Sequence, residues 1–394
     1  MTTGRALDGI RVIDVSQVMA GPFCAMQLAD MGADVVKVEP PEGDPTRQMG
    51  AGEGSDSAGF AALNRGKRAM VLDLKKPAGR DALVRLAGKA DILIENFRPG
   101  VMQQLGLDYK TLSAANSCLI YASISGYGQT GPDAAKGGFD LVAQGVSGLM
   151  SVTGEPGRPP VKCGVPLTDL GAGLFALSAI LAALYHRERT TRGQYVDTSL
   201  LEAGLALSVW EAAEHFSSGV TPQPLGSAHR FLAPYQAIRC ADGHITIGAG
   251  TDKLFVALCD LLGQPQWAKM PDFANAALRV QNRNVLTTRI ETITLVKPMA
   301  HWLDRLNARG IPCGPINTYA DALATPQVQA RQMVVSIDHP TLGEVKTLGS
   351  PIKMSETPPT VGRKVPQLGE HTQEVLKEAG FSEEEIAAVT ERQT

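Results

Sequence analysis

The chain has 394 residues, 44% of them hydrophobic, and its 37 Lys and Arg against 40 Asp and Glu give a formal net charge of -3. This length exceeds the size at which a single core usually stops growing, so we expect two domains. A nearly neutral chain has no general field for nucleic acid or an anionic membrane, so an anionic ligand requires a local cluster of basic residues.

Six cysteines are scattered without metal-binding spacing or a secretory context, and we interpret them as reduced thiols of a cytoplasmic protein. The first residues lack the apolar run of a signal peptide. The longest nearly uncharged apolar stretch, 170–185, has 16 residues, whereas a membrane span requires roughly 20. We therefore predict a buried helix there and no membrane association.

Strand-like and helix-like patterns alternate over the first 125 residues. Apolar, mostly β-branched runs predict strands at 10–15, 35–38, 69–74, 91–95 and 118–125. Segments 23–30 and 77–89 have helical spacing. Apolar strands separated by helices predict an α/β fold with a parallel sheet covered on both faces.

Helical patterns then dominate, and a second region follows a break in composition. Helices are predicted at 139–150, 170–187 and 200–217, with a loop rich in Gly and Pro at 154–166. After the break at 219–224, a hairpin at 235–247 and helices at 252–262 and 299–309 predict a smaller α+β domain. Strand-like segments return at 334–337 and 343–348, and an amphipathic helical pattern covers 372–390. We divide the chain into 1–218, 225–324 and 325–394, and periodicity leaves open whether the last part rejoins the first.

Two segments are candidate binding sites because each follows a predicted parallel strand, at the edge where open α/β sheets place their ligands. The turn 16–22 contains Met19 and Ala20. Segment 95–100 offers Asn96, Phe97 and Arg98, a set suited to an adenine ring and its phosphates. Further cations around this edge are Lys37, Arg47, Arg65, Lys67, Arg68, Lys75 and Lys136. An ordinary turn and solvated surface charges are the alternative interpretation.

Asp169 is the third candidate, because it follows the Gly/Pro-rich loop and begins a long apolar helix. Such a carboxylate either caps the helix or is held, with any oxyanion formed from it, by helix-terminal amides at the edge of a pocket. The sequence has no P-loop, GxSxG or HExxH motif, and Gly126-Tyr127-Gly128 does not complete a dinucleotide fingerprint. These absences argue against an ATPase, a hydrolase, a zinc enzyme and a dehydrogenase.

Together these segments resemble the family III CoA-transferases, the group of formyl-CoA transferase and carnitine CoA-transferase. The matching segments follow one another nearly end to end: 7–9, 20–22, 28–40, 43–44, Arg47, 64–68, 72–75, 95–100, 125–128, Asp169, 192–194, 310–315 and 369–372. The resemblance implies a Rossmann-like large domain built from both chain ends, a small domain inserted between them, and two subunits interlocked as a homodimer.

The resemblance also implies an enzyme that moves CoA from an acyl-CoA to a small carboxylic acid. Asp169 is then the catalytic residue, acting through mixed anhydride and aspartyl-CoA thioester intermediates without metal or permanent cofactor. The residues expected to contact CoA are Met19, Ala20, Lys37, Leu72, Lys75, Asn96, Phe97, Arg98, Tyr127 and Lys136. We expect succinyl-CoA as donor and a dicarboxylate such as itaconate, citramalate, mesaconate or glutarate as acceptor. His229 and Arg230 are expected to meet its distal carboxylate, the alternative being two exposed surface residues.

Departures from the family pattern bear on the substrate and on the reaction. Met19 stands where formyl-CoA transferase has glutamine, Arg98 replaces a glycine, and 226–230 does not reproduce its tetraglycine loop. The related α-methylacyl-CoA racemases pair the aspartate with a histidine in a Gly-His-Asp segment. Here the segment reads Gly138-Phe139-Asp140, and Phe139 cannot serve as a second base. A racemase-like epimerase with another base and a non-catalytic CoA-binding protein remain the alternative functions.

Overall fold

The computed structural model describes residues 4–50, 57–362 and 364–390. The chain forms two compact units. Unit 1 comprises the chain up to Leu149, Lys162–Gly219 and the part from Pro326 onward, and unit 2 comprises Met150–Val161 and Val220–Thr325. The segment Met150–Val161 thus belongs to unit 2, whereas the division made from the sequence includes it in 1–218.

Unit 1 contains a parallel sheet in which the strands are ordered β3-β2-β1-β4-β5-β6. The strands are β1 (Arg11–Asp14), β2 (Asp34–Glu39), β3 (Arg68–Val71), β4 (Ile92–Glu95), β5 (Ile120–Ser125) and β6 (Tyr195–Ser199). This is the strand order of a doubly wound Rossmann fold, and the direction of winding reverses between β1 and β4. The carboxyl ends of β1 and β4 therefore flank the position where such sheets bind ligands. The predicted α/β fold with a parallel sheet is confirmed.

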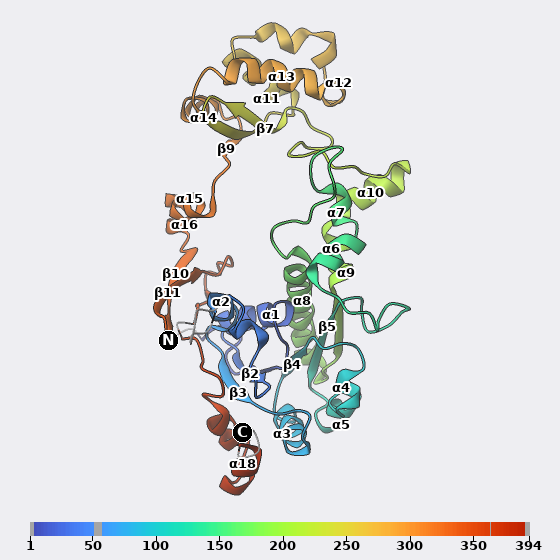
Figure 1. Cartoon of the computed structure of the whole chain (residues 1–394), viewed down its shortest axis with the longest axis vertical. Coiled ribbons are helices and arrows are strands. Elements are labelled where there is room, and N and C mark those ends of the chain that lie inside the picture. The colour runs from blue at the N-terminus through green and yellow to red at the C-terminus, as the bar shows by residue number, and fades with distance from the viewer. Residues whose placement is uncertain (1–3, 51–56, 363, 391–394) are drawn as a thin grey trace. The chain divides into compact units, whose positions relative to one another are not determined.

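Helices cover both faces of this sheet, as the continuous apolar strands predict. On one face, α1 (Ala20–Asp30) and α8 (Leu167–Thr190) pack against alternate strand residues, which include Val12, Ile94 and Ala122. On the other face, Ile13, Val36 and Leu93 pack against α3 (Pro77–Ala87) and the two C-terminal helices α17 (Thr372–Glu378) and α18 (Glu383–Thr390). Both ends of the chain therefore contribute to unit 1, and Figure 1 shows α18 in red near α3.

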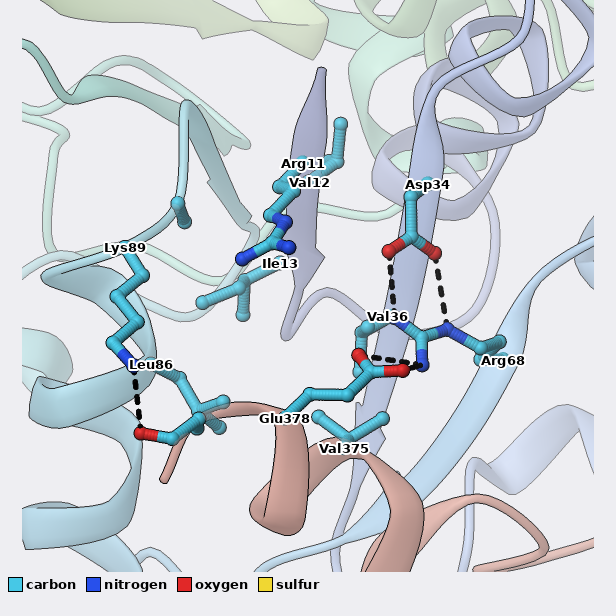
Figure 2. A pocket seen from close by; sticks show the side chains of 12 residues that line it. Arg11, Val12, Ile13, Asp34, Val36, Arg68, Leu86, Lys89, Val375 and Glu378 are labelled. Carbon is cyan, nitrogen blue, oxygen red and sulfur yellow. Dashed lines mark hydrogen bonds and ion pairs between the residues drawn. The ribbon is translucent and has the colours of Figure 1, made fainter. Parts of the chain in front are cut away.

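Ion pairs fix the returning C-terminal segment to the amino edge of the sheet (Figure 2). Arg68 of β3 binds the Asp34 carboxylate through Nε (3.0 Å) and Nη2 (2.6 Å). Its Nη1 donates to Glu374 (2.9 Å) and Glu378 (3.0 Å) of α17. Lys89 donates to the Ala379 carbonyl at 2.9 Å. The cavity between these side chains is about 40 Å³, large enough for water only.

The remaining elements of unit 1 are short or pack around the sheet. They are η1 (Pro45–Arg47), α2 (Ala58–Asn64), α4 (Val101–Gln104), α5 (Tyr109–Ala115), α6 (Asp140–Val146), α9 (Leu200–Leu207), α10 (Val209–Ser218), α16 (Pro326–Ala330), β10 (Val334–His339) and β11 (Gly343–Leu348). Strands β10 and β11 form an antiparallel hairpin. Helix α7 (Leu149–Val152) lies at the boundary between the units.

Several predicted helices are interrupted. The single helix predicted at 372–390 is two helices, because Gly380 has φ of +85° and ends the first of them. The pattern 139–150 divides into α6 and α7, and 200–217 divides into α9 and α10 at Ser208. Helix α8 is longer than predicted. It is long and apolar enough to cross a membrane by length and composition alone, and half of its most apolar window is buried within the protein.

Unit 2 is a small α+β unit with its own core. Its three-stranded antiparallel sheet has the order β7 (Tyr235–Cys240), β8 (Gly243–Gly248) and β9 (Cys313–Pro315). The helical elements are α11 (Asp252–Leu261), η2 (Pro265–Lys269), η3 (Pro271–Phe273), α12 (Ala276–Gln281), α13 (Arg283–Thr294), α14 (Met299–Ala308) and α15 (Tyr319–Ala324). Ile245, Phe255 and Trp302 are among the residues of the core. The predicted hairpin at 235–247 is present as β7 and β8.

Candidate functional site

The turn between β1 and α1 forms the first wall of a cavity at the switch point of the sheet. The Asn96 side chain, which follows β4, accepts a hydrogen bond from Gln17 N (2.8 Å) and donates one to Gln17 O (2.7 Å). Val18 has φ of +66°, which is rare for a β-branched residue and costs about 1–3 kcal/mol. The turn is thus held in a strained conformation by a side chain from the neighbouring strand.

Two buried ion pairs lie next to this turn and support it. Lys37 Nζ binds Asp44 Oδ2 at 2.8 Å and donates to the Ser16 carbonyl. Lys67 Nζ binds Asp14 Oδ2 at 2.9 Å. Burial opposes ionisation of both aspartates most strongly, but the lysine charges and hydrogen bonds outweigh it and hold the pKa of Asp14 and Asp44 below the ordinary value.

The loops after β4 and β5 form the second wall. Glu95 Oε2 accepts a hydrogen bond from Phe97 N at 2.9 Å and so fixes the turn that carries Phe97 and Arg98. The loop after β5 is in close backbone contact with segment 136–139. A Cβ atom on Gly126 would lie 2.6 Å from the Gly138 Cα atom, so both positions require glycine.

Asp169 lies in the first turn of α8, three residues after the N-cap Pro166. It is not the N-cap, and the backbone NH of Thr168 is instead satisfied by Asp140 Oδ1 at 3.0 Å. Within residues 4–50, 57–362 and 364–390, no hydrogen bond or ion pair involves the Asp169 carboxylate. Partial burial, and secondly the negative charge of Asp140, raise the pKa of Asp169 to about 6.

These elements surround a cavity of about 360 Å³, a volume typical of small-molecule sites. Its wall contains seven of the residues predicted from the sequence: Met19, Ala20, Asn96, Phe97, Arg98, Lys136 and Asp169. A neighbouring cavity of about 160 Å³ contains Leu72 and Lys75, and Phe97 lines both cavities. The structure therefore brings nine predicted residues to one edge of the sheet.

Four predicted residues lie elsewhere. Lys37 has no exposed side-chain atom to offer to a CoA phosphate, in contrast to the prediction, because its ammonium is fully buried against Asp44. Tyr127 follows Gly126 but is not in the wall of either cavity. His229 and Arg230 belong to unit 2, where Arg283 Nη2 donates to the His229 carbonyl at 2.6 Å.

Sequence reasoning missed the residues that support the site rather than line it. Asp14, Asp44, Asp140 and Gln144 were not predicted as site residues, and Asp140 entered the sequence analysis only through the segment Gly138-Phe139-Asp140. Their partners become apparent only when the strands and helices are assembled. Among the described residues, no group of three or more His, Cys, Asp or Glu side chains is arranged to hold a metal ion.

Comparison with known proteins agrees with the resemblance drawn from the sequence. A succinate–glutarate CoA-transferase of Agrobacterium fabrum is 41% identical over 380 residues, covering 94% of this chain and 95% of that protein. A succinyl-CoA:mesaconate CoA-transferase of Haloarcula hispanica is 40% identical, with coverage of 95% and 96%. The crystal structure of a CaiB/BaiF family protein from Brucella suis superimposes with a TM-score of 0.86 at 40% identity, covering 95% of this chain and all of that one. The sequence model of CoA-transferase family III matches residues 7–372, and the chain is an enzyme that belongs to this family.

Proposed function

We propose that Asp169 is the nucleophile of CoA transfer between carboxylic acids. The observation that carries the proposal is a carboxylate that lines a cavity at the switch point of the sheet and has no cationic partner among the described residues. A carboxylate in a salt bridge is a poor nucleophile because the cation stabilises its charge. With a pKa of about 6, Asp169 is mostly ionised at neutral pH and remains available for attack.

The reaction has two halves, one with the donor and one with the acceptor, and each half consists of two acyl-transfer steps. An Asp169 oxygen attacks the donor thioester carbonyl, the C–S bond breaks, and a mixed anhydride and CoA thiolate result. The thiolate attacks the aspartyl carbonyl, the C–O bond to the donor breaks, and the donor acid leaves an aspartyl-CoA thioester. The acceptor carboxylate then repeats these steps in reverse order, and Asp169 is regenerated without net proton transfer.

The two adjoining cavities support the placement of CoA. We place its adenosine end in the cavity of Leu72 and Lys75, with the Phe97 ring as the wall shared with the larger cavity. The cations Lys75, Arg98 and Lys136 would then meet the phosphates. Tyr127, which directly follows Gly126 of the larger cavity's wall, remains a further candidate contact. The thioester would reach the turn of Met19 and Ala20, next to Asp169.

We propose a small dicarboxylate as acceptor and succinyl-CoA as donor. The relatives whose names specify glutarate and mesaconate support this class. His229 and Arg230 are the candidates for binding the distal carboxylate of the acceptor, with itaconate and citramalate as further acceptors.

Replacement of Arg230 by Met should raise KM roughly 10- to 100-fold for a dicarboxylate but not for a monocarboxylate of equal length. Arg309→Met, at an exposed position in the same unit, is the matched control.

Racemisation has less support from the same cavity. Its wall contains Phe139, whose side chain is 75% exposed, where a racemase would place a basic histidine. Among the described residues that line this cavity, none is a histidine. Incorporation of solvent deuterium at the α-carbon without an acceptor acid would favour racemisation and contradict the transfer mechanism. A non-catalytic CoA-binding role would require that Asp169→Ala leave the biological activity intact.

Trapping of the covalent intermediate tests the proposal directly. The protein is incubated with a panel of acyl-CoAs, treated with hydroxylamine and digested, and peptides are analysed by mass spectrometry. We expect a hydroxamate at Asp169 that is absent from Asp169→Asn and retained in Asp304→Asn, an exposed aspartate of unit 2. Absence of the hydroxamate with every donor would contradict the nucleophilic role.

We also propose that the enzyme is an interlocked cytoplasmic homodimer, as the family resemblance implies. Large apolar side chains on α9 and α10 are exposed in the single chain, including Leu207, Trp210 and Phe216, which is 84% exposed. Such a surface is typical of a subunit interface. Light scattering should give twice the chain mass of 41.7 kDa, and a monomer would contradict this part of the proposal.

A further inference from the structure

A hydrogen-bonded network joins α6 to the beginning of α8, the helix that carries Asp169. We propose that Gln144 and Asp140 are positioning residues that fix the first turn of α8 and thereby the placement of Asp169. This inference rests on the proposed function, because it assigns these residues a role in the reaction of Asp169.

Gln144 is 1% exposed, and each polar end of its side chain has a partner. Its Nε2 donates to Asp140 Oδ2 at 2.7 Å and to the Val165 carbonyl at 3.4 Å. Its Oε1 accepts from Cys163 N at 2.9 Å. A single buried amide therefore fixes both the loop that enters α8 and the carboxylate that caps it.

Asp140 uses its other oxygen on the first turn of α8. Oδ1 accepts from Thr168 N at 3.0 Å and from Thr168 Oγ1 at 2.8 Å. Thr168 is fully buried and directly precedes Asp169. Because Asp169 makes no hydrogen bond of its own among the described residues, its position is set by the backbone that Asp140 and Gln144 hold.

The Asp140 carboxylate also acts on Asp169 through its negative charge. Charged groups near the cavity include Arg98 and Lys136 in its wall, Asp140 on α6, and Glu202 on α9, which bonds to Ser199. Behind the wall, Asp44 accepts from Val18 N and is paired with Lys37, and Glu95 accepts from Phe97 N. Among them, the negative charge of Asp140 is the one that raises the pKa of Asp169, after the effect of burial. Removal of that charge should therefore shift ionisation of Asp169 to lower pH.

Variants of residues 140 and 144 can distinguish the effect of the hydrogen bonds in this network from the effect of the negative charge on Asp140. In Asp140→Asn the new NH₂ group faces Gln144 Nε2, and rotation of the Gln144 amide only moves the mismatch to Cys163 N. In Gln144→Glu two carboxylates face each other. In the double variant, the introduced glutamate accepts from both the introduced asparagine and Cys163 N. The bond between residues 140 and 144 and the bonds from Cys163 N and Thr168 N are then restored, and only the 3.4 Å bond to the Val165 carbonyl is lost. The charge is moved from residue 140 to residue 144.

The test compares the four proteins by hydroxylamine trapping over pH 4.5–8 and by melting temperature. We expect each single variant to form the Asp169 adduct roughly 10²-fold more slowly than wild type, because misplacement of the nucleophile is costly. The double variant should recover both the melting temperature and the rate of adduct formation. The midpoint of the pH dependence of that rate should lie below the midpoint for wild type. Single variants that react at the wild-type rate, or a double variant that regains stability but not adduct formation, would overturn the inference.

A second measurement distinguishes failure of this inference from failure of the proposed function. The pKa of Asp169 is measured by NMR titration of the ¹³C-labelled aspartate carboxyl, assigned with Asp169→Asn. If wild type forms no adduct with any acyl-CoA, the proposed function fails, and an unchanged Asp169 pKa in the double variant would then overturn the electrostatic role of Asp140 as well. If wild type reacts and the variants do not differ from it, only the inference fails.

Discussion

Replacement of Asp169 by Asn should make the protein more stable at neutral pH while abolishing the covalent intermediate. The pKa of Asp169 rises from 3.8 to about 6 on folding, because burial and then Asp140 disfavour its charged form. A carboxyl whose pKa is higher in the folded state binds its proton more tightly there. The free energy of unfolding therefore falls as the pH rises from about 4 to 6, and it stays lower by the full amount above pH 6.

The shift of about two pKa units corresponds to at most roughly 3 kcal/mol, and we take about 1–2 kcal/mol for this partly solvated group. The asparagine side chain carries no charge and avoids this cost. We expect Asp169→Asn to raise the melting temperature by about 1–3 °C at pH 7.5 and by only about a third as much at pH 4.5, where the folded protein holds the proton of Asp169.

Thermal unfolding at pH 4.5, 6 and 7.5, followed by circular dichroism, measures this effect. Glu384→Gln is the control, because Glu384 is an exposed carboxylate in the first turn of α18, where neutralisation removes a favourable interaction with the helix dipole. The control should be unchanged or less stable at pH 7.5. An Asp169→Asn protein no more stable than wild type at pH 7.5, or equally stabilised at pH 4.5, would refute the argument that Asp169 is ionised at a cost.

Four further predictions concern the site and the fold that supports it. Lys37→Met should lower the free energy of unfolding in urea by about 3–5 kcal/mol, because it leaves buried Asp44 without its cation. Lys75→Met, at an exposed position, should instead weaken CoA binding in calorimetry without loss of stability. Gly126→Ala should lower kcat/KM roughly 10²-fold, because the added methyl forces apart the loops that meet at Gly138; Gly164→Ala, with open space around it, should have no such effect. Arg68→Met should detach α17, seen as faster proteolysis of the C-terminal segment and a loss of about 1–3 kcal/mol, and unchanged proteolysis would contradict the role of its ion pairs.

The parts of the fold that the sequence predicted are those with a strong local pattern. Strands β1 to β5 are buried on both faces and therefore read as continuous apolar runs. The edge strand β6 was missed because its sequence Tyr-Val-Asp-Thr-Ser is largely polar, as a half-exposed edge allows. The break at Gly380 was missed because a helical pattern continues on both sides of it.

The candidate site was predictable where function places residues directly after strands. Asn96 and Phe97 follow β4, and Met19 and Ala20 follow β1, so the general rule for parallel sheets located them. The part played by Asn96 was not predictable, since its amide is directed at the backbone of Gln17 rather than at a free surface. Lys37 shows the opposite error, because a lysine near a binding edge suggests a phosphate contact, and only packing reveals that it is buried.

Three aspartates of unit 1 show why a residue type alone does not define a nucleophile. Asp14 and Asp44 are buried beside lysines, which lower their pKa and fix their charge in permanent ion pairs. Asp169 is less buried, yet its pKa is raised, because burial is joined there by the charge of another carboxylate. A stabilised carboxylate has little to gain from forming a covalent bond, whereas Asp169 loses an unfavourable charge when it attacks a thioester. The reactivity that we propose for Asp169 therefore follows from the lack of a cationic partner among the described residues and from the placement of Asp140 behind it.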